Sequence, residues 1–203
     1  MHDRKTESKE TFDRLAPRYD RHFYGSHGRR QYQRVIAASS AWHFASVLDV
    51  GCGTGNLLSL FRGRNITLAG SDLSPGMVAE AVRRLGGDAD VRVADSESLP
   101  WDAGSFDLVV STDSFHHYPR PLQALSEMRR VLRRNGHLVL ADVWAPFPIR
   151  QLGNLAARFG RDGDVRVYSD MELTLMMRET GFEEIKRVAN TFSAIVMAAA
   201  VHK

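Results

Sequence analysis

The sequence predicts an α/β fold, a doubly wound and mostly parallel sheet of seven strands that ends in an antiparallel hairpin. Short apolar, β-branched runs alternate along the chain with amphipathic helical segments, as in parallel sheets with crossover helices. A glycine-rich turn follows the first of these runs, and the last two are joined by a link too short for a crossover. With 203 residues, 43% of them hydrophobic, the chain suits one compact domain over residues 1–203.

The segment before the first strand is rich in helical and aromatic signals. Residues 1–9 are polar, and we expect them to be frayed. From Glu10 to Tyr24 apolar residues recur at helical spacing, residues 25–28 form a break, and a further helix spans Arg30 to Phe44. These helices are amphipathic, so we expect them to pack on the sheet.

The first strand and the turn after it have the composition of a nucleotide-type site. Val47–Val50 is a short buried strand, and Gly51, Gly53 and Gly55 follow it before a helical segment, Asn56–Phe61. Glycines let a ligand approach the backbone closely, and the unpaired N–H groups at the start of a helix attract the negatively charged end of the ligand. The spacing differs from a dinucleotide fingerprint and lacks the lysine of a Walker loop.

Strands and helices then alternate. Ser74 is a suitable N-cap, with Pro75 at the first position of a helix that runs to about Leu85. Another helix spans Pro121–Arg134 and is stopped by Asn135-Gly136. The strands expected in this region are Ile66–Ser71, Val91–Ala94, Phe106–Ser111 and His137–Asp142.

The end of the chain departs from this alternation. Residues 145–167 are irregular around a short apolar segment, Ile149–Phe159, and Ser169 caps a helix that stops at Gly181. The two apolar runs that follow must pair as an antiparallel hairpin, because only three residues separate them. The runs are Phe182–Val188 and Phe192–Val201.

Polar side chains stand at the ends of the first four predicted strands. They are Asp49 in the first strand and Asp72, Asp95 and Ser111 after the next three. Ligands of open α/β sheets bind at the carboxyl ends of the strands, so these side chains are expected to face one ligand. Asp72 follows the glycine turn by about 20 residues, the offset at which a carboxylate accepts hydrogen bonds from ribose hydroxyls.

The run Asp49-Val50-Gly51-Cys52-Gly53-Thr54-Gly55 resembles motif I of the class I S-adenosylmethionine-dependent methyltransferases. Residues 99–109 and 132–138 fit the same broad group, which includes quinone C-methyltransferases. The stretch Phe12–Asp20 resembles the N-terminal segment that folds over the cofactor in these enzymes. The resemblance covers the chain from Phe12 to the terminal hairpin, and it implies a helical lid at about residues 10–44.

The resemblance also implies S-adenosylmethionine as cofactor and a small molecule as methyl acceptor, with oxygen, nitrogen or carbon as the accepting atom. Gly51 and Gly53 would pass beside the methionine part, with Asp49 facing its ammonium. Asp95 would accept from the adenine amino group, and the backbone after it would reach the adenine ring. The implied cofactor-binding residues are Tyr19, Asp49, Gly51, Cys52, Gly53, Asp72, Leu73, Met77, Asp95, Ser96 and Ser111.

Two adjacent histidines, His116 and His117, follow the fourth strand. This edge faces the methyl group in the family, and the pair resembles the histidine-containing turn of many small-molecule members. A histidine can take a proton from a phenol or an ammonium near neutral pH, and we favour His117 as that base. The alternative is that one histidine packs under Tyr118-Pro119 and the other is solvated, because many such enzymes use no base.

The composition argues against several other classes of protein. The net charge is +3, from 27 Lys+Arg and 24 Asp+Glu, so paired arginines are read as solvated helix faces and nucleic acid is not the expected partner. The single cysteine, Cys52, excludes a disulfide framework or metal–thiolate cluster, and no metal site is expected. The charged start differs from a signal peptide, and the longest apolar run, Ala194–Val201, is too short to span a bilayer.

We therefore expect a cytoplasmic enzyme, with its oligomeric state left open. Two alternatives remain at this point. One is a non-catalytic S-adenosylmethionine-binding module, which would keep the glycine turn and Asp72 without an acceptor pocket. The other is an RNA methyltransferase, which the mild basicity permits and no nucleic-acid motif supports.

Overall fold

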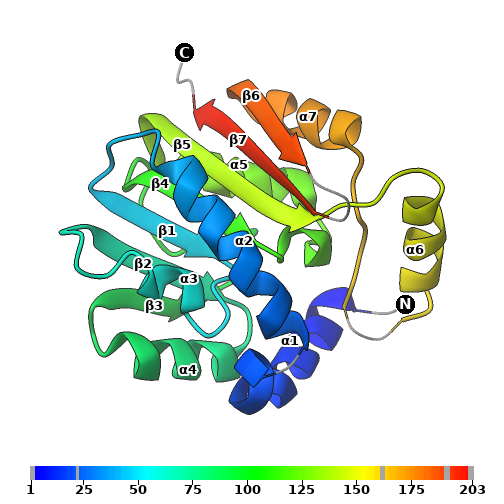
Figure 1. The fold of residues 1–203 in the computed structure, drawn as a ribbon, viewed down its shortest axis with the longest axis horizontal. Coiled ribbons are helices and arrows are strands. Elements are labelled where there is room, and N and C mark those ends of the chain that lie inside the picture. The colour runs from blue at the N-terminus through cyan, green and yellow to red at the C-terminus, as the bar shows by residue number, and fades with distance from the viewer. Residues whose placement is uncertain (1–2, 22, 161–162, 190–192, 201–203) are drawn as a thin grey trace.

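The computed structural model describes residues 3–21, 23–160, 163–189 and 193–200, and it has helices on both faces of one sheet (Figure 1). The strands are β1 (Ser46–Val50), β2 (Thr67–Asp72), β3 (Ala89–Val93), β4 (Phe106–Thr112), β5 (Leu132–Val143), β6 (Phe182–Ala189) and β7 (Ser193–Ala200). They form a seven-stranded sheet in the order β3-β2-β1-β4-β5-β7-β6. The first five are parallel, and β7 lies antiparallel between β5 and β6, which confirms the predicted fold class.

The helices flank this sheet. They are α1 (Arg4–Leu15), the 3-10 helix η1 (Ala16–Arg21), α2 (Phe23–Ser39), α3 (Asn56–Ser59), α4 (Pro75–Leu85), the 3-10 helix η2 (Phe115–His117), α5 (Pro121–Val131), α6 (Ile149–Ala157) and α7 (Asp170–Glu179). Among the residues that the structure describes, no helix has both the length and the apolar composition needed to cross a membrane.

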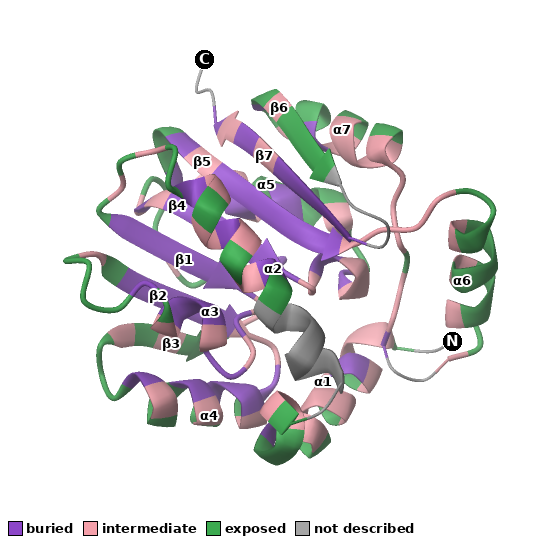
Figure 2. Cartoon of the chain, in the orientation of Figure 1, coloured by how far each residue is buried: buried purple, intermediate pink, exposed green. Residues whose placement is uncertain are grey.

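The sheet has a hydrophobic core on each face, because side chains of the inner strands alternate between the two faces. Leu48 of β1 packs in the core that includes Met128 of α5. Its neighbour Val47 packs on the opposite face, with Val35 of α2 and Leu58 of α3. The central strands are buried along most of their length, as expected for parallel strands covered on both faces (Figure 2).

The strand order reverses beside β1, which pairs with β2 on one edge and with β4 on the other. Parallel strands on the two sides of such a reversal leave a crevice at their carboxyl ends, where ligands of doubly wound sheets bind. The glycine turn after β1 and the histidine pair of η2 after β4 both lie at this edge.

Local signals predicted two helices closely. Helix α4 begins at Pro75, and the Met77 N–H donates to Ser74 Oγ at 3.0 Å. Helix α7 begins after Ser169, whose side chain and backbone exchange hydrogen bonds with Glu172 in a capping box. The terminal hairpin is also present, although residues 190–192 of its link lie outside the described residues.

The predicted helix over Pro121–Arg134 is wrong at its end. Helix α5 stops at Val131, and the chain continues directly into β5. Leu132 is fully buried and pairs with Phe106 of β4, so strand pairing overrides the helical pattern there. The sharp turn at Asn135, with φ of 61°, falls inside the long strand instead of ending the helix.

Three further expectations are wrong. Residues 3–9 are not frayed, because α1 begins at Arg4 and Asp3 caps it by accepting from the Lys5 N–H at 3.2 Å. The backbone of α2 runs through the expected break at residues 25–28; the side chains of residues 22–29 lie outside the described part. Within the segment 145–167, expected to be irregular, the apolar stretch forms α6.

Candidate functional site

The glycine turn after β1 wraps around the end of β2. The N–H groups of Gly51 and Cys52 both donate to the Ser71 carbonyl, at 2.8 and 2.9 Å. Gly51 has φ of 78°, and a Cβ there would overlap the Ser114 side chain, so packing requires glycine. Gly53 has φ of 51°, and a Cβ there would meet no atom within 4 Å, so its backbone borders open space.

Two buried carboxyl groups lie at the ends of β1 and β2. Asp49 is 2% exposed, and its Oδ1 has no hydrogen-bond partner among the described residues. Burial, together with the nearby Asp72, raises the pKa of Asp49 to about 8. Asp72 accepts from the N–H groups of Gly53 and Ser74, each at 2.9 Å, and burial still raises its pKa to about 6. Asp49 therefore offers an unsatisfied polar atom beside the open backbone of the turn.

Two adjoining cavities share Gly51 and Asp72. The first, of about 50 Å³, is lined by Lys5, Ser8, Val50, Gly51, Ser71, Asp72, Leu73, Ala94, Asp95, Ser96, His117, Tyr118 and Pro119. The second, of about 40 Å³, is lined by Phe12, Tyr19, Tyr32, Asp49, Gly51, Cys52, Gly53, Asp72, Met77, Thr112 and Asp113. All the residues implied for cofactor binding line one cavity or the other, except Ser111.

Ser111 is buried and contacts Tyr118, which lines the first cavity. Its Oγ lies 3.3 Å from the Tyr118 hydroxyl, which also hydrogen-bonds with Ser114 Oγ at 2.8 Å and donates to the Val50 carbonyl at 3.2 Å. This network ties β4 and η2 to the end of β1. The next residue, Thr112, lines the second cavity.

Two aspartates fix the N-terminal segment over the cavities. Asp13 of α1 accepts from Ser74 Oγ at 2.6 Å and from the Gly76 N–H at 2.9 Å, at the start of α4. Asp20 of η1 accepts from Thr54 and Asn56 in the glycine turn, at 2.8 and 2.7 Å, and forms an ion pair with Arg84 of α4. Both aspartates lie in or beside the stretch whose resemblance predicted a lid, although neither was singled out as a site residue.

Lys5 and Phe12 of α1 also reach the site. Lys5 forms ion pairs with Asp95 and with the buried Glu97. The Phe12 ring lies edge-on to the ring of His117, with 5.2 Å between their centroids. Sequence reasoning missed Lys5 because its partners, Asp95 and Glu97, are distant in the chain.

His116 is held by a carboxylate at the end of β5. Its backbone N–H donates to Asp142 Oδ2 at 2.9 Å, and its Nδ1 lies 2.6 Å from Asp142 Oδ1. Burial alone would lower the pKa of His116, but the charge of Asp142 outweighs burial and raises it to about 9. The His116 ring is therefore an imidazolium at neutral pH.

His117 has the opposite electrostatics. Burial, and then the adjacent charged His116, hold the pKa of His117 well below its usual range, so the ring is neutral at pH 7. Its Nδ1 lies 3.2 Å from Asp164 Oδ1, on the segment that follows α6. The expectation that one histidine of the pair is solvated is wrong, because the two side chains are only 15% and 12% exposed.

Atoms of His116, His117 and Asp164 lie within 4.8 Å of one another, the spacing of a metal-ion site. The positive charge of His116 between Asp142 and Asp164 accounts for this cluster without an ion. The three residues therefore form a charge-paired cluster.

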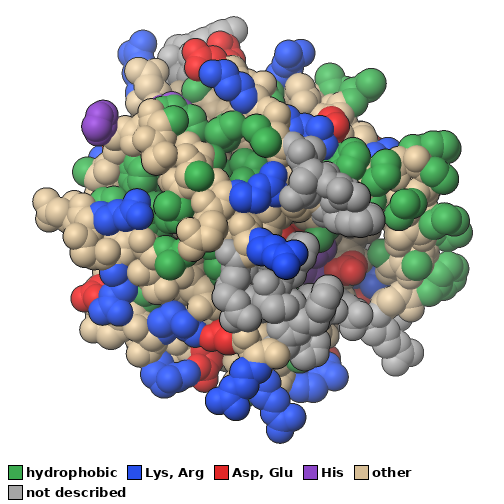
Figure 3. Space-filling view, viewed as in Figure 1, with side chains coloured by type: hydrophobic (Ala, Val, Ile, Leu, Met, Phe, Trp, Pro, Cys, Tyr) green, Lys and Arg blue, Asp and Glu red, His purple; other side chains and the backbone are tan. Residues whose placement is uncertain are grey.

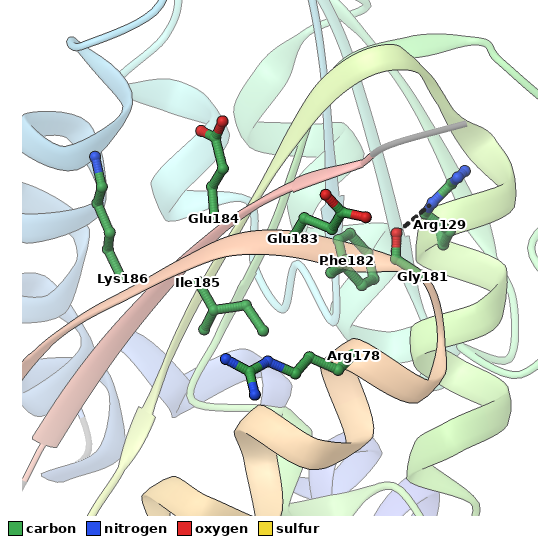
Figure 4. Close-up of a pocket in the computed structure, with 8 residues that line it drawn as sticks. All are labelled: Arg129, Arg178, Gly181, Phe182, Glu183, Glu184, Ile185 and Lys186. Atoms are coloured by element: carbon green, nitrogen blue, oxygen red, sulfur yellow. Dashed lines mark hydrogen bonds between the residues drawn. The ribbon is translucent and has the colours of Figure 1, made fainter. Parts of the chain in front are cut away.

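A broad surface groove lies far from these cavities, along the edge strand β6 (Figure 4). Arg178 of α7 lies below the strand, while Glu184 and Lys186 point to the other side. The Arg129 Nε donates to the Gly181 carbonyl at 3.1 Å across one end of the groove. None of its lining residues comes from the carboxyl ends of β1 to β4, so we do not place the functional site there.

Comparison with known proteins agrees with this geometry. A model of the methyltransferase domain family matches residues 48–140, which contain the glycine turn, Asp72 at the end of β2, Asp95 after β3, and the histidine pair. Malonyl-(acyl-carrier protein) O-methyltransferase of Enterobacter lignolyticus is 35% identical over 134 residues, 66% of this chain. The matched part of the chain covers about half, 52%, of that protein.

Two other relatives are covered more fully. Malonyl-(acyl-carrier protein) O-methyltransferase of Geobacter sulfurreducens is 31% identical, over 88% of this chain and 70% of that protein. Demethylmenaquinone methyltransferase of Thermotoga maritima is 27% identical, over 88% of this chain and 89% of that protein. Phosphoethanolamine N-methyltransferase 2 of Haemonchus contortus shares the fold, with a TM-score of 0.83 at 15% identity, over 100% of this chain and 61% of that one. The chain therefore belongs to the class I S-adenosylmethionine-dependent methyltransferases, a family of enzymes that includes the quinone methyltransferases.

Proposed function

We propose that this chain binds S-adenosylmethionine at the carboxyl ends of β1, β2 and β3 and transfers its methyl group to a small-molecule acceptor beside η2. The observation that carries the proposal is Asp49, a buried carboxyl group with an unsatisfied oxygen next to the open backbone of Gly53. A buried polar atom without a partner costs stability, so its retention fits a ligand that satisfies it. When bound, the cofactor supplies a methyl group already activated by a positively charged sulfur.

Different residues of the chain would bind different parts of the cofactor. Asp49 ionises as it pairs with the ammonium of the methionine part, because an adjacent positive charge lowers a carboxyl pKa. Asp72 holds the ribose hydroxyls: its oxygens are oriented by two backbone N–H groups and retain further acceptor capacity. Asp95 and Ser96 receive the adenine edge, with Leu73 and Met77 as the apolar walls.

The N-terminal segment would open to admit the cofactor. Pockets for ligands of drug size have volumes of about 300–1,000 Å³. The two cavities measure only about 50 and 40 Å³, too little for the cofactor as the segment now lies. Entry requires α1 and η1 to move, after which the lid excludes water from the reacting groups.

Methyl transfer would occur beside the histidine pair. An acceptor hydroxyl or ammonium must lose a proton during the reaction, and His117 is in the neutral form that can accept it. Asp164 lies where it stabilises the positive charge that then develops on His117. His116, held as an imidazolium by Asp142, orients the turn. The names of the relatives, which specify malonyl-(acyl-carrier protein) and demethylmenaquinone, support a small acceptor group.

Isothermal titration with S-adenosylmethionine and S-adenosylhomocysteine tests the binding site. Asp72→Ala should weaken both affinities by about 5- to 150-fold, which corresponds to roughly 1–3 kcal/mol for lost charge-assisted hydrogen bonds. Asp102→Ala, at an exposed carboxyl far from the cavities, serves as the matched control. Equal affinities in Asp72→Ala and the wild type would contradict the assignment of the ribose.

A methyl-transfer screen then tests the reaction. The wild type is incubated with labelled cofactor and with small phenols, amines, quinol precursors or bulk tRNA. We expect label in a small molecule. Label in tRNA alone would identify an RNA methyltransferase, and binding without transfer to any acceptor would favour a non-catalytic module.

A further inference from the structure

Helix α6 stands apart from the sheet at one edge of the molecule (Figures 1 and 2). It is nine residues long, and none of its residues is buried. Its large apolar side chains, Ile149, Leu152 and Leu155, are exposed, and hydrophobic side chains gather on the outside of this edge in the space-filling view (Figure 3). Isolated helices shorter than about 12–15 residues are only marginally stable in water. The order of α6 therefore depends on polar contacts instead of burial in the core.

A side chain of α1 holds the C-terminal end of α6. The Arg4 guanidinium donates to the carbonyls of Ala157, Arg158 and Gly160, at 3.0, 2.9 and 2.8 Å. The last carbonyl groups of a helix have no partner within it, and a positive charge is favourable there. Among the described residues, Arg4 supplies the hydrogen bonds that join residues 149–160 to another helix or strand. Helix α6 is therefore attached to the rest of the fold largely through α1.

The chain after α6 packs against α1 as well. Gly163 has φ of 79°, and a Cβ there would lie 2.5 Å from Ser8 Cα, so the two backbones touch at a position that requires glycine. Ser8 is buried and lines the first cavity, as Lys5 does, and Phe12 of the same helix lines the second. Helix α1 thus covers both cavities and also contacts the α6 segment, by which we mean residues 149–160 and 163–167.

The far end of the α6 segment contacts the histidine pair. Asp164 Oδ1 lies 3.2 Å from His117 Nδ1. The N–H groups of Val165 and Arg166 both donate to the His116 carbonyl, at 2.9 and 3.1 Å. Helix η2, which carries these histidines, is where we propose that the methyl acceptor binds. The α6 segment therefore connects the cover of the cofactor cavities with the acceptor side of the site.

We propose that α1 and the α6 segment move as one unit, so that cofactor binding beneath α1 also sets the position of the α6 segment on the acceptor side. This inference rests on the proposed function, in which α1 moves to admit the cofactor. If α1 moved alone, the end of α6 would lose its hydrogen bonds from Arg4, and Gly163 would lose its contact with Ser8. Movement together keeps these contacts, and no buried residue of α6 opposes it.

The joint movement would couple the two ligands. When the unit opens, the hydrogen bonds to the His116 carbonyl break and Asp164 leaves His117, so the acceptor side is incomplete. When the cofactor holds α1 closed, the same contacts are restored. Cofactor binding would therefore raise the affinity for the acceptor, and the acceptor would raise the affinity for the cofactor by the same factor, because coupling between two sites is reciprocal.

Hydrogen–deuterium exchange of the whole protein, read by mass spectrometry, tests the coupling with S-adenosylhomocysteine as the probe. In the wild type we expect the probe to slow exchange in both α1 and α6 by about fivefold or more, the lower end of typical coupling between sites. In Arg4→Met it should slow exchange in α1 and leave α6 unchanged. Arg14→Met, the same change at an exposed residue of α1, is the matched control and should behave as the wild type.

The ligand-free proteins give a second comparison. Arg4→Met should accelerate exchange in α6 by about tenfold or more, because it removes hydrogen bonds from a charged donor, while exchange in α7 stays the same. Helix α1 itself should persist, since loss of a positive charge from the first turn does not weaken a helix.

A variant of the backbone contact tests the same unit independently. Gly163→Ala should abolish the effect of the probe on α6, because its side chain would push the segment away from Ser8. Gly63→Ala is the control, since Gly63 has a similar φ of 73° and a Cβ there would meet no atom within 4 Å. Slowing of α1 alone in the wild type, or unchanged slowing of α6 in both Arg4→Met and Gly163→Ala, would overturn the coupling. Absence of S-adenosylhomocysteine binding to the wild type would refute the proposed function itself.

Discussion

Replacing Asp49 by asparagine should have opposite effects on stability and on cofactor binding. Asparagine has the same shape and remains uncharged, so it mimics the protonated carboxyl group that burial favours. The variant should therefore be more stable than the wild type at pH values between the ordinary pKa of an aspartate and the raised pKa of Asp49 in the folded chain. It should also lose the charge that we propose to face the cofactor's ammonium, and its affinity should fall at least tenfold.

The pKa of Asp49 sets the size and the pH range of the stability effect. That pKa is about 8 in the folded chain, against an ordinary value of 3.8. An acid with a raised folded pKa stabilises the fold fully below its unfolded pKa, and this contribution is lost as pH rises toward the folded value. The loss amounts to about 1.4 kcal/mol per pH unit inside this window. The variant should gain about 3 kcal/mol over the wild type between pH 5 and pH 7.

Urea unfolding, followed by circular dichroism at pH 5, 6 and 7, measures this difference. Asp102→Asn provides the control, because it makes the same substitution at an exposed side chain that lines neither cavity. The decisive quantity is the slope of the difference in unfolding free energy against pH. A slope near zero for Asp49→Asn would mean that Asp49 is ionised in the free protein, and the reasoning from burial would be wrong.

Three further changes probe the lid and the histidine pair. Asp20→Asn removes the charge that faces Arg84, so limited proteolysis within residues 10–24 should accelerate while the free energy of global unfolding is unchanged. Equal cleavage rates in the variant and the wild type would show that Asp20 does not help to hold this segment. Asp142→Asn should lower the pKa of His116 from about 9 toward its ordinary 6.5, as read by NMR titration. The loss of stability should be about 3 kcal/mol below pH 6.5 and should vanish above pH 9, because a raised histidine pKa stabilises only the protonated form. His117→Ala should cut turnover on the true acceptor by roughly 10²-fold or more with cofactor affinity nearly unchanged, whereas near-normal turnover would assign both histidines to the scaffold.

Local chemistry explains which elements the sequence could predict. Helix α4 has its N-cap, Ser74, its first-position Pro75 and its terminal Gly86 all within the segment itself. The glycine turn and the aspartates at the carboxyl ends of β1, β2 and β3 could likewise be predicted, because each stands at the end of an apolar run. The parallel order then brings them to one edge of the sheet.

Distant partners explain what could not be predicted. The end of α5 depends on the pairing of Leu132 with Phe106, and the order of α1 depends on contacts of Arg4 with residues 157–160 and of Lys5 with Asp95. The hydrophobic periodicity of one segment carries no information about such distant partners. Helix α6 was missed for a local reason: Pro146, Pro148, Gly153 and Gly160 are helix breakers by composition, and they surround a short apolar segment.

Several contacts that hold the N-terminal segment, which we propose to be a lid, are polar and partly exposed, and this would affect how it opens. The side chains of Asp20 and Arg84 are 35% and 29% exposed, and exposed ion pairs contribute only about 0–1 kcal/mol each. Lys5 pairs with Asp95, the same carboxylate that we propose for the adenine edge, so cofactor and lid compete for one group. Large buried apolar side chains in place of these pairs would each add about 1.5–3 kcal/mol to the cost of opening. Polar contacts would therefore allow the segment to cover the proposed site and still release it when the cofactor offers stronger partners.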